Sequence, residues 1–127
     1  MKIRTQDLTG ADLNWAVAKC EGIRVIRCDA GKNQYLAYVP KRSAYKKYSP
    51  STNWIQGGPI IEREEIHILR AYTPPEWVAS IAYSPKDGKQ LVGGRRVASA
   101  PTPLVAAMRC YVVSKLGDEI DVPKELT

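Results

Sequence analysis

Residues 48–64 (YSPSTNWIQGGPIIERE) gather side chains that could contact a ligand. Three hydroxyls, an Asn, a Trp and two adjacent glycines lie between Tyr48 and Gly58. Glycines let backbone N–H groups approach an anion, hydroxyls donate to phosphate oxygens, and an indole stacks on a base. This pattern predicts a cradle for a nucleotide-like anion. The alternative is a helix-capping turn whose Trp is anchored in the core.

The segment lacks the known phosphate-binding motifs. No Gly-Lys-Ser or Gly-Lys-Thr follows the glycines, as a P-loop would require, and no Gly-x-Gly-x-x-Gly opens a helix after a strand. The prediction therefore depends on residue chemistry and not on a motif.

A second group follows further along the chain, where Gly93 and Gly94 precede Arg95 and Arg96. Two neighbouring guanidinium groups after flexible glycines can hold a phosphate through paired hydrogen bonds, although a solvated loop is the alternative. We expect both groups to line one electropositive hollow. The predicted ligand-binding residues are Tyr48, Ser49, Ser51, Thr52, Asn53, Trp54, Gly57, Gly58, Arg95 and Arg96.

Catalytic, metal and cofactor sites are not expected. His67 is the single histidine and lies between two isoleucines of a predicted strand, where a structural or surface role is the more common outcome. Glu62, Glu64 and Glu65 alternate with Arg63 as on a solvated helix face. Without a nucleophile at a motif spacing, hydrolysis of a cyclic nucleotide is only an alternative to binding.

Size and charge narrow the class of protein. A chain of 127 residues suffices for one domain, which we place at residues 1–117, followed by an acidic tail at 118–127. The net charge of +6 suits an anionic partner but also simply favours solubility. Three cysteines without paired short spacings indicate free thiols, and the absence of a long apolar run or signal sequence predicts a cytoplasmic protein without membrane contact.

Local patterns predict two amphipathic helices around a set of strands. Thr9 begins a capping-box pattern and Gly22 ends the first helix, while Thr102, Pro103 and Gly117 bound the last one. Residues 23–28 and 34–39 form a predicted hairpin, and residues 66–72 and 77–83 form a second strand pair joined through 73–75.

The remaining segments are predicted mainly from the prolines and glycines that interrupt helices and strands. Residues 40–59 are expected to be a loop with a short helix capped by Ser51 or Thr52 and a break near Pro59, where a new helical turn starts. A turn at 85–88 and a short strand at 90–92 follow. The fold class is α+β, a mostly antiparallel sheet packed with the N-terminal and C-terminal helices as a helix-sheet-helix sandwich.

Three blocks resemble the NinX-like family of small tailed-phage proteins: residues 8–22 (LTGADLNWAVAKCEG), 48–64, and 102–118 (TPLVAAMRCYVVSKLGD). The resemblance implies a phage-encoded protein acting in the host cytoplasm. It supplies no catalytic residues, and nothing in residues 71–100 contributes to it.

These observations favour a phage accessory protein that binds a nucleotide-like small molecule and sequesters a host immune signal. Two alternatives remain open: a nucleic-acid-binding factor for phage replication or recombination, and a binder of a host protein. We also expect a homo-oligomer, because a pocket shared between protomers would enlarge a small ligand site.

Overall fold

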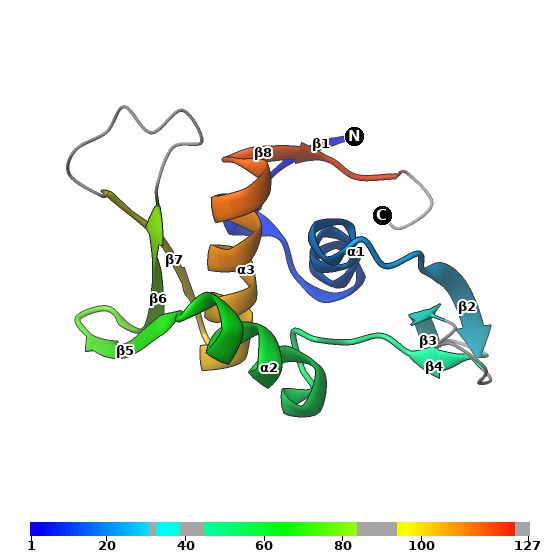
Figure 1. Cartoon of the computed structure of the whole chain (residues 1–127), viewed down its shortest axis with the longest axis horizontal. Helices are drawn as coiled ribbons and strands as arrows, with labels where there is room; N and C mark the ends of the chain where they lie inside the picture. The colour runs from blue at the N-terminus through cyan, green and yellow to red at the C-terminus, as the bar shows by residue number, and fades with distance from the viewer. Residues whose placement is uncertain (31–32, 39–44, 84–93, 124–127) are drawn as a thin grey trace.

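The computed structural model describes residues 1–30, 33–38, 45–83 and 94–123. It is an α+β fold in which helix α3 (Pro103–Leu116) lies between helix α1 (Gly10–Glu21) and the sheet β5–β7, with α2 (Trp54–Glu64) across the N-terminal end of α3 (Figure 1). Within the described segments, no helix is long and apolar enough to cross a membrane.

Helix α3 begins and ends where the sequence predicts. The Thr102 hydroxyl accepts a hydrogen bond from the Val105 backbone N–H at 3.3 Å, Pro103 is the first helical residue, and Gly117 ends the helix with a φ of 88°. Its apolar surface is not a single stripe. Side chains on most sides of the helix are buried, namely Leu104, Ala106, Ala107, Met108, Cys110, Tyr111, Val112 and Val113. The helix is therefore the centre of the core.

Helix α1 also has its predicted bounds, with Thr9 at the N-cap and Gly22 in the left-handed conformation at the C-cap. The predicted capping box is wrong, however, because the Thr9 side chain makes no capping hydrogen bond. The Asp12 carboxylate oxygen Oδ1 is buried and has no hydrogen-bond partner in the described part of the chain.

Helix α2 runs without interruption through Gly57, Gly58 and Pro59, so the predicted break near Pro59 is wrong. Its cap is Asn53 and neither Ser51 nor Thr52, because the Asn53 side chain accepts the Ile55 N–H at 2.9 Å. A proline inside a helix removes one hydrogen bond and crowds the preceding turn. Burial of the neighbouring Ile60 against α3, at 2 % exposure, offsets part of that cost.

The described strands form three small antiparallel sheets, and not one sheet between two helices. Both predicted strand pairs are confirmed, as β2–β3 and β5–β6. Residues 46–47, predicted as loop, form a third strand beside β3. Residues 94–100, which include Arg95 and Arg96, form a third strand beside β6. The predicted turn at 85–88 and strand at 90–92 lie outside the described residues. The strands are β1 (Lys2–Arg4) with β8 (Glu119–Asp121); β2 (Ile26–Ala30), β3 (Asn33–Tyr38) and β4 (Lys46–Lys47); and β5 (His67–Tyr72), β6 (Pro75–Tyr83) and β7 (Gly94–Ala100).

The two ends of the described chain pair with each other. Ile3 lies opposite Ile120 in the β1–β8 ladder, and the Met1 amino group contacts the Asp121 carboxylate at 2.8 Å. Ile120 and Val122 are buried in the core. The first part of the acidic tail is therefore packed against the core by its apolar residues.

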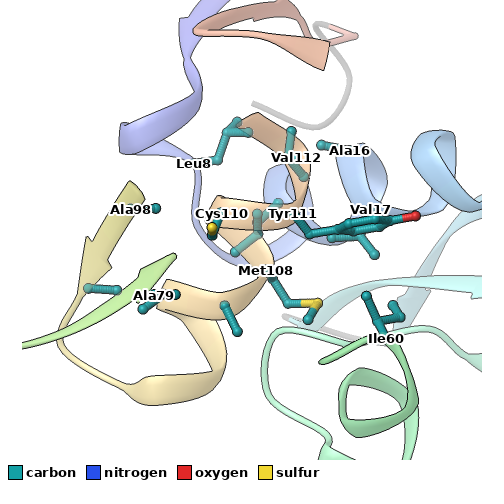
Figure 2. Close-up of a cluster of buried hydrophobic side chains, with 14 of the residues drawn as sticks. Leu8, Ala16, Val17, Ile60, Ala79, Ala98, Met108, Cys110, Tyr111 and Val112 are labelled. Carbon is teal, nitrogen blue, oxygen red and sulfur yellow. The ribbon is translucent and has the colours of Figure 1, made fainter. Parts of the chain in front are cut away.

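Two apolar clusters hold the elements together. The larger cluster surrounds α3, where Met108 contributes, and contains Val17 of α1, Ile60 of α2, Ala79 of β6 and Leu8, which precedes α1 (Figure 2). The smaller cluster joins α1 to the β2–β4 sheet through Ala18, Leu36 and Tyr48, with Trp15, Ile23, Val25 and Tyr38 packed against it. The small sheet is thus attached to the core mainly through α1.

Candidate functional site

Ser51, one of the predicted ligand-binding residues, is buried and bonded within the protein. Its backbone N–H and its hydroxyl both donate to the Asn14 side-chain oxygen, at 3.0 and 2.7 Å. Ser51 is 2 % exposed, and Asn14 is also buried. The pair fixes the segment before α2 to α1, so Ser51 has mainly a structural role.

Tyr48 and Ser49 are also largely buried. The Tyr48 ring packs edge-to-face on Tyr38 with centroids 5.4 Å apart, and burial raises the pKa of the Tyr48 hydroxyl above its usual range. The Ser49 N–H donates to the Gln56 side-chain oxygen at 2.6 Å, and the Gln56 amide nitrogen donates to the Lys47 carbonyl at 2.8 Å. Gln56 therefore ties the start of α2 to strand β4.

The two adjacent glycines have different surroundings. A Cβ atom at Gly57 would collide with the Pro50 carbonyl oxygen and lie 2.6 Å from Leu104 Cδ1, whereas a Cβ at Gly58 would meet nothing within 4 Å. Gly57 is consequently required for the close approach of α2 to α3. Its role is packing, and the sequence pattern alone did not separate it from Gly58.

Thr52 and Trp54 are accessible and line a hollow of about 240 Å³, here called the Trp54 hollow. Its other described lining residues are Ser51, Thr102, Pro103 and Leu104. The indole is 54 % exposed and so is not sealed in the core. No Lys or Arg appears among the described residues of this lining, which leaves it without a side-chain cation for a phosphate.

Tyr48 and Asn53 face a different hollow of about 490 Å³, here called the lysine hollow. It lies between the end of α1, strands β3–β4 and the start of α2. The described lining residues are Glu21, Ile23, Tyr38, Lys46, Lys47, Tyr48, Asn53, Ile55, Gln56 and Ile60. Cations, aromatic rings and amides thus occur together here, in a volume typical of small-ligand sites.

A neighbouring hollow of about 600 Å³, here called the Tyr45 hollow, lies beside the lysine hollow. Its described lining residues are Gly22, Ile23, Arg24, Ile26, Ala37, Tyr38 and Tyr45. Tyr45 is 62 % exposed. Tyr45, Lys46 and Lys47 fall in the loop predicted over residues 40–59, and no sequence pattern connects them with Tyr38 or with the end of α1.

The arginine pair lies in another part of the molecule. Arg95 and Arg96 belong to β7, where Arg96 lies opposite Ile81 in the β6–β7 ladder and is partly buried. The Cys110 thiol of α3 lies 3.4 Å from the Arg96 carbonyl oxygen. Arg96 does not appear in the described lining of the three hollows. The structure therefore does not bring it together with Tyr48 and Asn53.

A network of charged side chains adjoins the lysine hollow at Glu21. Arg63 of α2 donates to both Glu21 oxygens, at 3.0 and 2.7 Å, and the Tyr111 hydroxyl of α3 donates to Glu21 Oε2 at 2.6 Å. Burial and the bond to Glu21 raise the pKa of Tyr111. The negative charge of Glu21 is thus balanced within the protein.

The network continues to the end of α3. Arg63 Nε donates to Glu64 at 3.0 Å, and Lys115 lies 3.1 Å from the other Glu64 oxygen. The predicted solvated face is confirmed for Glu62, Arg63 and Glu65, which are exposed, but Glu64 is largely covered. Arg63 and Glu64 also connect α2 to other helices, which was not predicted. No local pattern predicts these contacts, since the partners Glu21, Tyr111 and Lys115 are far away along the chain.

Comparison with known proteins identifies a family for this chain. The family model described as Bacteriophage P22, NinX matches residues 4–115, a range that includes α1, α2 and all of α3 except its last residue. No curated protein matches the chain.

Proposed function

The chain belongs to the bacteriophage P22 NinX family, as its three sequence blocks indicated, and from this premise we propose that it is a phage accessory protein that binds a nucleotide-like anion in the lysine hollow. Binding without turnover would withhold that molecule from the host, as expected of a protein that sequesters an immune signal.

The observation that supports this proposal is the grouping of Lys46 and Lys47 with Tyr38, Tyr48 and Asn53 around one hollow. Lysine ammonium groups attract phosphate, and aromatic surfaces accept a base or sugar. Glu21 also lines the hollow, but its charge is matched by Arg63. Lys46 and Lys47 add positive charge to the lining, which favours an anionic ligand.

The start of α2 adds to the attraction for an anion. Asn53, Ile55 and Gln56 at its first turn all line the lysine hollow. Backbone dipoles give the N-terminus of a helix a partial positive charge, which favours nearby anions. The field of the helix thus has the same sign as the two lysines.

Binding, and not catalysis, fits the side chains present. The described lining of the lysine hollow contains no His, Ser or Cys, and Glu21 is occupied by Arg63 and Tyr111. His67 lies on β5, outside that lining. The described lining thus offers neither an imidazole, nor a thiol or serine hydroxyl, nor a carboxylate without partners for attack on a phosphate ester.

Native mass spectrometry tests the proposal directly. The protein would be purified from bacteria with active nucleotide signalling and compared with protein from resting cells. We expect an added mass of nucleotide size in the first sample, and the same molecule should bind again in calorimetry. A clean apo mass together with no heat from a panel of mono-, di- and cyclic nucleotides would overturn it.

A second candidate function is single-stranded nucleic-acid binding, favoured by the exposed Tyr45 near Arg24, Lys46 and Lys47. Stacking on an exposed ring combined with basic side chains is the usual arrangement for such ligands. It predicts an affinity that falls steeply between about 50 and 200 mM salt, since each phosphate contact releases counterions. Fluorescence anisotropy with a labelled oligonucleotide would show this fall, and negligible binding at low salt would remove the candidate.

A further inference from the structure

The lysine hollow and the Tyr45 hollow share two lining residues, Ile23 and Tyr38. Ile23 follows the C-cap of α1, and Tyr38 is the last residue of β3. Both side chains also pack against the smaller apolar cluster, which holds them in place. The two hollows therefore adjoin across a fixed apolar wall.

The hollows offer similar chemistry on the two sides of this wall. The lysine hollow contains Lys46, Lys47 and the Tyr48 ring, and the Tyr45 hollow contains Arg24 and the exposed Tyr45 ring. Each side thus has a cation for a phosphate and an aromatic surface for a base. That surface is the exposed Tyr45 ring on one side and the partly buried Tyr38 ring on the other, because Tyr48 itself is buried. One nucleotide unit needs only one such set.

The strand register places the two sides on one small sheet. Tyr38 lies opposite Lys46, and Ala37 lies between Ile26 on β2 and Lys47 on β4. Residues directly opposite one another in antiparallel strands project from the same face. Ile26 and Ala37 of the Tyr45 hollow therefore share a sheet face with Lys47, and Tyr38 shares the opposite face with Lys46, so both hollows adjoin this sheet.

We infer that the ligand contains two nucleotide units, one in each hollow, joined across Ile23 and Tyr38. This inference rests on the proposed function and narrows its ligand class from nucleotides in general to dinucleotides. The apolar wall suits the sugar or base between two phosphates, because it places no unpaired charge there. Arg24 and Tyr45 hold the second unit.

Calorimetry with AMP and with the linear dinucleotide pApA tests the inference. We expect pApA to bind at least about tenfold more tightly than AMP, as stacking of one further base implies. Arg24→Gln should reduce pApA affinity by roughly tenfold and leave AMP affinity within about twofold. Arg4→Gln on β1 is the matched control and should change neither, because Arg4 lies outside both described linings.

The outcomes separate the two proposals. If AMP binds and pApA binds no more tightly, or if Arg24→Gln affects both ligands or neither, the two-unit inference is wrong and the proposed function stands. If no nucleotide binds, both are wrong. If a single-stranded octanucleotide, dA8, binds far more tightly than pApA with a steep salt dependence, the ligand is an extended strand and the dinucleotide class is overturned.

Discussion

Arg63 donates one hydrogen bond to each oxygen of the Glu21 carboxylate, at 3.0 and 2.7 Å, and so joins α2 to α1. Paired bonds of this kind are stronger and more directional than a single ion pair. The Tyr111 hydroxyl of α3 donates to the same carboxylate. One carboxylate therefore holds three helices at the edge of the lysine hollow.

Replacing Arg63 with Gln should lower the free energy of unfolding by about 1–2 kcal/mol. The largely covered Glu21 carboxylate would then keep only the bond from Tyr111. The loss is limited because Arg63 is half-exposed in the native protein, where solvent weakens its ion pair. Urea titration followed by circular dichroism measures the change. Arg4→Gln, on the exposed β1 strand, is the control, and an equal loss in both variants would contradict a special role for the pair.

Acid should weaken the same network through Glu64. Burial alone would raise the pKa of this carboxyl, but hydrogen bonds from Arg63 and Lys115 outweigh burial and hold it below its usual value of about 4.3. A depressed pKa in the folded state contributes stability above the unfolded value, and this stability is lost as pH falls through the folded value.

The unfolding free energy of the native protein should therefore fall as the pH is lowered below about 4.3. Glu64→Gln cannot titrate and should show a shallower fall over that range, with lower stability at neutral pH. Urea titrations at several pH values give both curves. Parallel curves for the two proteins would show that Glu64 contributes nothing to the acid response.

Cys20 should react slowly with alkylating reagents. Burial is the main reason that the pKa of its thiol rises to about 12, and the neighbouring Glu21 adds to the shift. Since the thiolate is the reactive form, alkylation at pH 8 should be on the order of a thousandfold slower in the folded protein than in urea. Peptide mass spectrometry after timed iodoacetamide treatment measures both rates, and equal rates would place the thiol in solvent.

The two glycines of α2 give a matched pair for stability. Gly57→Ala should destabilise the protein by roughly 1–3 kcal/mol, because the new methyl group overlaps Pro50 and Leu104. Gly58→Ala meets open space and should stabilise the helix by roughly 0.5–1 kcal/mol. Thermal unfolding of both variants decides the point. Similar effects in the two variants would mean that α2 does not approach α3 as closely as described.

The sequence identified the elements whose signals are local. Helices α1 and α3 were bounded correctly because Gly22, Thr102, Pro103 and Gly117 act through their own backbone preferences. Helix α2 was divided wrongly, because the burial that stabilises it across Pro59 depends on contacts with distant residues. Strand β7 was not predicted, since its first residues are a glycine and two arginines and its pairing with β6 depends on a segment distant along the chain.

The candidate site was only partly predictable for the same reason. Residues 48–58 were identified by composition, yet the fold divides them between the Trp54 hollow, the lysine hollow and the interior. Glu21, Tyr38 and Lys46 come from three elements, and no short motif connects them. Arg95 and Arg96 are as suitable for binding phosphate as Lys46 and Lys47 are, but the residue type does not reveal which sheet a residue joins.

Ligand binding should distinguish the lysines from Trp54. If the anion lies in the lysine hollow, Lys46→Gln and Lys47→Gln should each weaken nucleotide affinity by roughly fivefold or more, since each removes a charge-assisted contact. Lys2→Gln makes the same charge change on β1 and should have little effect. Trp54→Ala should also have little effect, because Trp54 lines the hollow without a described cation. Calorimetry on the four variants measures these differences. A loss of affinity confined to Trp54→Ala would indicate that the ligand binds in the Trp54 hollow, at the N-terminal end of α3.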